Sequence, residues 1–305
     1  MAPTFWKSLM RTLKALARSM AVAVTLLSLA SQAATANPII PQPGASAAAM
    51  VANLIGNSSG IVVTPNSELY TGAAIASGLF TGADGVLPFA GGVALTSGSV
   101  NLVPGPNNAE DAEAVNNAAS NPNLNALSPG ADVYGDASTL AFTFRTTGNA
   151  ISFQYVFGSE EYPEFVGLYN DVFGFFLDGV NIALIPNTTT PISINTVNSG
   201  VNSQYYRDNP TDDLNIQYDG LVGVSMPLFA TAAVTPNVEH TIMFGVEDVA
   251  DLKYDSGVML AAGSFVATGL PDPTPEPIPE PATLLTSASG LAVLVRYIRR
   301  RGPAA

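Results

Sequence analysis

The sequence contains no cysteine at all. Without thiols the chain can form no disulfide and no thiolate metal site, and it has neither a cysteine nucleophile nor a lipidated cysteine. Its single histidine, His240, argues against zinc, because zinc sites take several histidine or cysteine ligands. We expect His240 to be a structural or partly exposed residue and not a metal ligand. An exported form of this protein would therefore have to be stable without covalent cross-links.

Basic residues are scarce between the two ends of the chain. From residue 37 to residue 270 only Arg145, Arg207 and Lys253 are basic, against 21 carboxylates, which gives a net charge of −18. Such a surface repels phosphate backbones and attracts cations. We therefore expect no nucleic-acid partner.

The N-terminus has the three-part pattern of a secretory signal peptide. Four basic residues precede the apolar run 20–30, and small residues follow it. This order predicts a signal peptide over residues 1–36, which signal peptidase would remove after Ala34-Thr35-Ala36. An amphipathic helix of the folded protein is the alternative, but the uniformly apolar run fits it less well. We expect export, with a mature domain over residues 37–270.

The C-terminus combines a proline-rich spacer, an apolar stretch and an arginine cluster. Residues 271–281 alternate proline with other residues, which predicts an extended spacer. Residues 282–305 hold an apolar stretch that ends in four arginines, so we expect a transmembrane helix with a cytoplasmic tail. A buried C-terminal helix is the alternative, but it would need neither the spacer nor the arginines.

Short apolar runs separated by turn residues dominate the mature domain. Aromatic and β-branched residues predict strands over 151–157 and 172–177, and in the first of these the odd-numbered side chains share one face. Ser46 is the expected N-cap of one short helix over 47–55. Residues 104–130, rich in asparagine, proline and alanine, are expected to form a long surface loop that is functional or mobile.

The spacing of the strands predicts their pairing and the fold class. We expect residues 139–145 to form a hairpin with 151–157, and 238–246 to pair with 257–267. Roughly ten strands, little helix and no fixed repeat indicate an all-β fold. The expected architecture is a two-sheet β-sandwich, jelly-roll-like, with one short N-terminal helix.

Two acidic segments are the candidate metal site. They lie between predicted strands, and loop carboxylates together with backbone carbonyls provide the six to eight oxygen ligands of Ca²⁺. If both segments meet at one end of the sandwich, repulsion between their carboxylates would favour a bound cation. The alternative is that they are ordinary solvated loop residues. The candidate ligands are Glu160, Glu161, Asp171, Asp248, Asp251 and Asp255.

Two other functions compete with a calcium-stabilised adhesion or structural module. Aromatic rings beside polar groups suit a lectin-like glycan-binding patch, here Tyr162, Tyr169, Tyr205 and Tyr206. A glycoside hydrolase could use Glu160 and Asp171 as its carboxylate pair. No nucleophile elbow or phosphate-binding loop occurs in the sequence, so we expect a protein that is not an enzyme.

Two parts of the sequence resemble known families. Pro279-Glu280-Pro281, with the apolar stretch and arginines after it, resembles the PEP-CTERM sorting signal of exported Gram-negative proteins. This resemblance implies processing by an exosortase, with membrane anchoring followed by transfer to the cell surface or exopolysaccharide matrix.

Residues 47–267 resemble the choice-of-anchor L family of extracellular bacterial modules. The segments that carry this resemblance include Phe157-Gly158-Ser159-Glu160-Glu161-Tyr162, residues 170–176, Tyr218-Asp219-Gly220 and residues 254–258. The resemblance implies an exported, surface-associated domain, whose partner could be an exopolysaccharide or a surface glycan.

Overall fold

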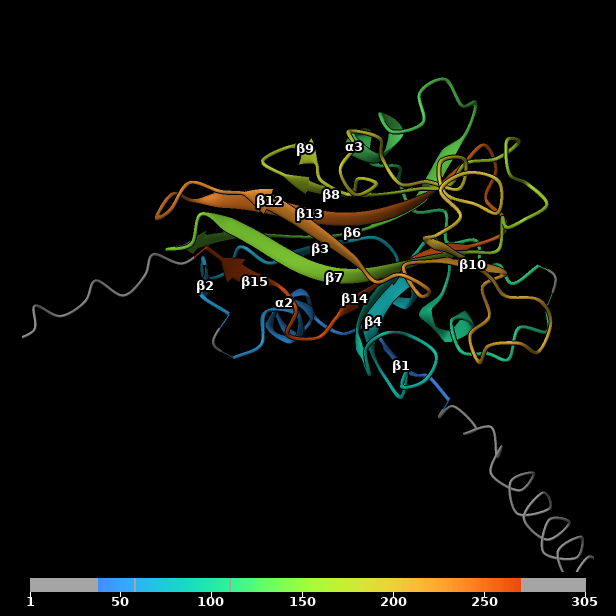
Figure 1. Cartoon of the computed structure of the whole chain (residues 1–305), viewed down its shortest axis with the longest axis horizontal. Helices are drawn as coiled ribbons and strands as arrows, with labels where there is room; N and C mark the ends of the chain where they lie inside the picture. Colours follow the sequence, from blue (N-terminus) through green and yellow to red (C-terminus); the bar gives the residue numbers. More distant parts are fainter. Residues whose placement is uncertain (1–37, 58, 110, 270–305) are drawn as a thin grey trace, which may run out of the picture. The chain divides into compact units, whose positions relative to one another are not determined.

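The computed structural model describes residues 38–57, 59–109 and 111–269 (Figure 1). The predicted signal peptide, the whole proline-rich spacer and the predicted membrane helix with its tail lie outside these residues. In the described part of the chain, no helix is long and apolar enough to cross a membrane.

The predicted N-terminal helix is confirmed as α2 (Ala47–Ile55). The Ser46 hydroxyl accepts a hydrogen bond from the Ala49 amide at 3.2 Å, which satisfies one of the free amides of the first turn. Gly56 ends the helix with φ of +59°, a conformation that suits glycine. The helix buries Met50 and Leu54 in the main core.

Most other elements are strands in two antiparallel sheets, so the predicted two-sheet β architecture is confirmed. The first sheet contains β1 (Ile40–Pro43), β4 (Ser77–Thr81), β5 (Gly92–Thr96), β7 (Ala150–Ser159), β10 (Tyr206–Asp208), β11 (Gly220–Val222), β12 (Leu228–Ala233), β14 (Ser256–Ala261) and β15 (Val266–Thr268). The second contains β2 (Ile61–Val63), β3 (Leu69–Thr71), β6 (Tyr134–Thr146), β8 (Val172–Leu177), β9 (Val180–Asn181) and β13 (His240–Val249). Three short helical turns interrupt the connections: η1 (Ala74–Ala76), η2 (Val100–Leu102) and α3 (Pro122–Asn125).

Long central strands organise each sheet. The first sheet has the order β1-β4-β5-β14-β7-β11-β10, and β12 and β15 also pair with β7. The second has the order β2-β6-β13-β8-β9, and β3 pairs with β6. In Figure 1, β6, β8 and β13 lie above β7 and β14.

The main core fills the space between these sheets with aromatic rings. The odd-numbered side chains of β7 share this core, as predicted, and Phe153 packs edge-to-face against Phe175 of β8 and Phe244 of β13, each with ring centroids 5.1 Å apart. Such aromatic pairs add to the free energy gained by burying apolar surface. The alternating pattern of β7 therefore fixes which face of the first sheet meets the second.

Both predicted strand pairings across short connections are wrong. Strand β6 pairs with β13, β2 and β3, whereas β7, which follows it, lies in the other sheet. Likewise β13 and β14 follow one another in sequence but belong to different sheets. Both connections therefore cross from one sheet to the other.

The crossings bring the two acidic segments to one end of the sandwich. Segment 160–171 leads from β7 to β8, and segment 250–255 leads from β13 to β14. Ser159 at the end of β7 pairs with Ser256 at the start of β14, and Glu247 near the end of β13 pairs with Val172 at the start of β8. Both acidic segments therefore leave and enter the sheets at the same rim.

Candidate functional site

Five of the six predicted metal-ligating residues are buried together at this rim. Glu161, Asp171 and Asp248 are 0% exposed, Glu160 is 1% exposed and Asp255 is 3% exposed. Asp251, the sixth, is only partly buried, and one of its carboxylate oxygens accepts a hydrogen bond from the Lys253 amide. Buried carboxylates are uncommon in proteins unless they are paired or bind a metal.

A serine connects the two acidic segments directly. The Ser256 hydroxyl donates to Asp171 at 2.8 Å, and it lies next to Asp255 in the chain. The second oxygen of Asp171 accepts a hydrogen bond from the Val249 amide at 2.9 Å. The Glu160 amide also donates to the Asp255 carbonyl at 3.2 Å. Residues that are about 85 positions apart in the sequence thus form one site.

The other four buried carboxylates have unsatisfied oxygens. Both carboxylate oxygens of Glu160, Glu161, Asp248 and Asp255 are buried without a well-formed hydrogen bond. Polar groups do lie close enough to lower the pKa of some of them, such as the Ala112 amide at Glu160 and Ser97 at Asp248. These contacts fall short of hydrogen-bond geometry. A buried and unpaired polar atom costs free energy, so the oxygens need partners.

Basic side chains do not provide those partners in the described part of the chain. Arg145 pairs with Glu239 on the surface at 3.5 Å, and Arg207 pairs with Asp213. Lys253 acts on Asp251, where its charge lowers the carboxyl pKa against the effect of burial. The buried carboxylates therefore face one another without a compensating cationic side chain among the described residues.

Burial and mutual repulsion raise the pKa of every carboxyl in the site. Burial is the largest cause throughout, and it raises the pKa of Glu160 and Glu161 to about 9. The pKa of Asp255 rises to about 7, again chiefly through burial. The pKa values of Asp171 and Asp248 are also raised, first by burial and then by the charges of Glu161 and Asp171 respectively. An empty site would thus retain protons near neutral pH.

The adjacent residues Glu160 and Glu161 lie in two different electrostatic environments. The carboxylates that act most strongly on Glu161 are Asp251 and Asp248, which lie just after β13 and within it. The one that acts most strongly on Glu160 is Asp219, which lies immediately before β11. The site therefore has an inner part around Glu161 and an outer part around Glu160.

Segment 104–130, predicted to be a long surface loop, covers the site. Asp136, a buried residue of β6, accepts hydrogen bonds from the amides of Asn116 at 2.8 Å and Ala118 at 2.6 Å. The Asn116 side-chain amide donates to the carbonyl of Gly98 at 2.7 Å. The Ala114 amide lies near Asp255 and lowers its pKa. This cover keeps water away from the carboxylates.

The backbone around the second acidic segment adopts unusual conformations. Ala250 has φ of +82° and Tyr254 has φ of +56°. Residues other than glycine, asparagine and aspartate seldom adopt such angles, and they do so where the surrounding structure holds them. The surrounding structure therefore holds the segment in the turn that places Asp255 beside Gly98.

The carboxylates of the site do not by themselves form a complete metal coordination sphere. Among the described residues, no group of three or more His, Cys, Asp or Glu side chains is arranged to hold a metal ion. A cation here would have to combine carboxylates with neutral oxygens such as backbone carbonyls, hydroxyls and water. Ca²⁺ accepts such mixed and flexible ligand sets, whereas Mg²⁺ requires a tight octahedron.

The four candidate glycan-binding tyrosines lie in different surroundings. Tyr162 is fully buried and its hydroxyl donates to the Val197 carbonyl at 2.7 Å. Tyr206 is also buried, and its ring lies 5.0 Å from that of Tyr162. Tyr205 packs partly against the main core, and Tyr169 contacts the ring of Phe165. Tyr162 and Tyr206 therefore have a packing role.

A cleft of about 660 Å³ opens beside the outer part of the site. Its lining includes Glu160, Glu164, Phe165, Asp219 and Tyr254. Sequence patterns predicted no site role for Asp219, Asn107 or Asn209, which shape this cleft, because short polar residues in irregular segments are too common to indicate one. The same holds for Asp136, which lies within a strand.

A comparison of the sequence with known protein families identifies the family of this chain. Residues 40–266 match the family described as the Choice-of-anchor L domain. The chain belongs to this family. The search of curated proteins found no match, and neither did the search of solved structures. Membership indicates a surface-associated module, as the sequence resemblance predicted.

Proposed function

We propose that this Choice-of-anchor L protein is an exported adhesion or matrix module in which Ca²⁺ occupies the buried carboxylate site and joins the two acidic segments. The observation that carries this proposal is the set of six buried carboxylate oxygens without well-formed hydrogen bonds on Glu161, Asp248 and Asp255, in the inner part of the site. A divalent cation would neutralise the repulsion that raises their pKa values. The ion would thereby stabilise the rim on which the module meets its partners.

The test is the melting temperature of the purified protein with Ca²⁺ and with a chelator. Saturation at about 100 times Kd adds about 2.7 kcal/mol to the free energy of unfolding, which raises the melting temperature of a domain of this size by about 5–10 °C. Mg²⁺ should give a smaller rise. Identical curves with Ca²⁺ and chelator would remove the ion from the proposal.

A matched pair of variants locates the ion. Asp255→Asn removes one buried charge from the site, so we expect it to lose most of the Ca²⁺-dependent rise. Asp132→Asn removes one charge from an exposed position and should keep the full rise. Equal effects of the two substitutions would point to general screening of an acidic surface.

The proposed route to the surface depends on the two ends of the chain. A signal peptide over residues 1–36 would direct export, and an exosortase would process the chain near Pro279-Glu280-Pro281 after the membrane helix has anchored it. Mass spectrometry of the mature protein should find an N-terminus at Asn37 and a C-terminus before residue 282. Replacing Glu280 with alanine should leave the protein in the membrane fraction, whereas the same change at Glu276 should not.

A glycoside hydrolase has less support from the site. Asp171 is fully buried and both its oxygens already accept hydrogen bonds, from Ser256 and from the Val249 amide. A carboxylate held in this way is a positioning group for the fold. Release of sugar from polysaccharide that disappears in Glu160→Gln would reverse this assignment.

A further inference from the structure

The cleft beside Glu160 has the chemistry of a binding site for an organic cation. Four carboxylates line it, and its lining includes no lysine, arginine or histidine. Its volume of about 660 Å³ lies in the range of small-molecule sites and exceeds what one metal ion needs. The four carboxylates belong to Glu160, Glu164, Asp208 and Asp219.

The burial of Glu160 distinguishes this cleft from an ordinary acidic surface patch. The Glu160 side chain lines the cleft although the residue is only 1% exposed, and neither carboxylate oxygen has a well-formed hydrogen bond. A carboxylate buried in this way at the base of an open cleft is prepared for a ligand donor. The exposed Glu164 adds a second acceptor at the mouth of the cleft.

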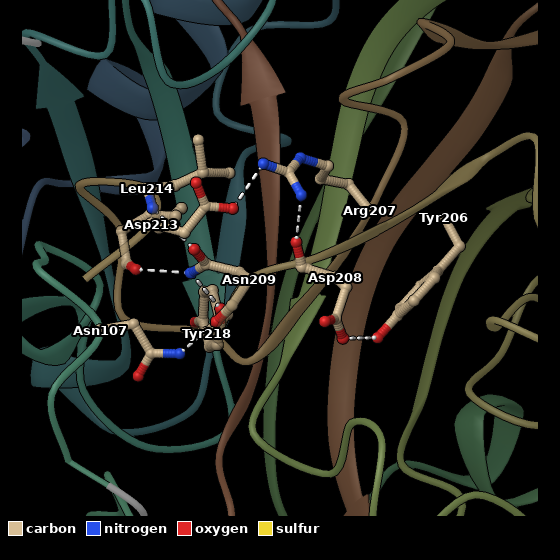
Figure 2. Close-up of polar contacts among 9 residues, drawn as sticks. Asn107, Tyr206, Arg207, Asp208, Asn209, Asp213, Leu214 and Tyr218 are labelled. Atoms are coloured by element: carbon tan, nitrogen blue, oxygen red, sulfur yellow. Dashed lines mark hydrogen bonds and ion pairs between the residues drawn. The ribbon is translucent and has the colours of Figure 1, made fainter. Parts of the chain in front are cut away.

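Hydrogen bonds hold the walls of the cleft in place (Figure 2). The buried side chain of Asn209 donates to the carbonyls of Ile216 at 2.9 Å and Tyr218 at 2.7 Å. Asn107 donates to Asp219 at 2.7 Å and to the Asn209 carbonyl. The cleft is therefore preformed, which lowers the entropic cost of binding.

Arg207, the arginine beside the cleft in the described part of the chain, pairs with Asp213, which is outside the lining. Figure 2 shows the Arg207 guanidinium turned toward Asp213, whereas the Asp208 carboxylate lies on the other side with the Tyr206 hydroxyl. That hydroxyl donates to one Asp208 oxygen at 2.9 Å. Asp208 is thus oriented by a hydroxyl group, and its carboxylate is not part of the Arg207–Asp213 ion pair.

An aromatic wall completes the cleft. The rings of Phe165 and Tyr254 are 4.6 Å apart, both residues are half-buried, and both line the cleft. Aromatic faces attract cations and also pack against the C–H faces of sugar rings. At the exposed edge, Asn108 and Thr211 add an amide and a hydroxyl that suit ligand hydroxyl groups.

We propose that this cleft binds a protonated amino sugar, such as a de-N-acetylated hexosamine unit of a polysaccharide. The carboxylates bind the ammonium group, the Phe165–Tyr254 wall packs against the ring, and the polar edge binds the hydroxyl groups. A simple alkyl amine would leave the polar edge unused. This inference rests on the cleft and does not require the calcium ion.

Calorimetric titration of the full-length protein in excess Ca²⁺ tests the proposal. The probes are a glucosamine oligomer, the N-acetylglucosamine oligomer of the same length, spermidine and a lysine-containing peptide, at a pH where the amines are protonated. We expect the glucosamine oligomer to bind about tenfold or more tightly than its neutral counterpart, since acetylation removes a charge-assisted contact. Equal affinity for the two oligomers, or tighter binding of spermidine or the peptide, would overturn it.

Matched variants connect binding to the cleft. Glu164→Gln and Asp208→Asn should each weaken glucosamine binding about tenfold, whereas Asp132→Asn, outside the cleft, should not. The Ca²⁺-dependent melting curve of each variant shows whether it is folded. Equal loss in all three variants would contradict the proposal. Amino-sugar binding without a calcium effect on melting would remove the ion and leave the cleft assignment standing.

Discussion

Gly98 provides the space that the Asp255 carboxylate occupies. A Cβ atom at position 98 would overlap the carboxyl group of Asp255, which is buried and cannot swing into solvent. The absence of a side chain at one residue therefore sets the position of a candidate ligand.

Gly98→Ala should displace Asp255 and disturb the site without removing a charge. We expect the Ca²⁺-dependent rise in melting temperature to fall by at least half, together with a loss of about 1–3 kcal/mol in stability from overpacking. Differential scanning fluorimetry with Ca²⁺ and with chelator measures both effects.

Gly200→Ala is the control for this change, because a Cβ atom there would have only an ordinary contact with the Asn198 side chain. It should keep the full Ca²⁺ effect. A Gly98→Ala protein that responds to Ca²⁺ like the wild type would show that Asp255 takes no part in ion binding.

At the residue scale, the sequence identified the acidic residues but not their surroundings. Glu160 and Glu161 are adjacent and chemically alike, yet they face different groups of carboxylates. Most aspartates and glutamates are solvated, so the residue type alone favoured exposed positions. Burial of these carboxylates depends on the sheets and on the cover from segment 104–130, which lie far away in the sequence.

Among the elements, segment 104–130 depends on Asp136 for its position over the site. Asp136 uses both carboxylate oxygens to accept amides of this segment, from Asn116 and Ala118. The φ of Asp136 is +53°, which asparagine adopts as readily as aspartate.

Asp136→Asn therefore tests the cover without changing the backbone preference. The asparagine amide group cannot accept the second hydrogen bond, so the substitution should cost about 1–3 kcal/mol and loosen residues 111–121. Hydrogen exchange measured by mass spectrometry should show faster exchange in that stretch. Asp132→Asn, at an exposed position, is the control, and unchanged exchange in Asp136→Asn would mean that the cover is held by other contacts.

The strands show which parts of the fold local patterns could predict. Residues 172–177 were predicted as a strand and form β8 with the same bounds, because six consecutive apolar positions suit a strand buried on both faces. The pairing of β6 with β7 was wrong, because a short polar connection suits either a hairpin or a crossing between sheets. The choice between a hairpin and a crossing depends on how both strands pack in the whole fold, which the connection itself does not show.

At the scale of the whole molecule, the buried carboxylates make stability depend on pH. Carboxyl groups of the unfolded chain ionise near pH 4–4.5, whereas in the folded, ion-free protein the pKa of Glu160 and Glu161 is about 9 and that of Asp255 about 7. Between these values the folded state binds more protons than the unfolded state. Its stability must therefore fall as the pH rises from about 4.5 to about 9.

With a chelator present, we expect the melting temperature to decrease steadily from about pH 5 to about pH 9. In excess Ca²⁺ the decrease should be much smaller, because the ion takes the place of the protons and binds more tightly as they leave. The stabilisation by Ca²⁺ should therefore grow with pH. A chelated protein that is equally stable across this range would show that the carboxylates are already balanced without an ion.

The sequence by itself determined the composition of the site and the class of the fold. The absence of cysteine, the excess of carboxylates and the alternating aromatic strands already indicate a β-sandwich that attracts cations, since these are properties of single residues and of their periodicity. Only the tertiary structure decided that the segments after β7 and β13 both cross to the opposite sheet at the same rim. This arrangement brings Asp171 next to Ser256. Burial and proximity arise from packing between distant segments, and no local pattern encodes them.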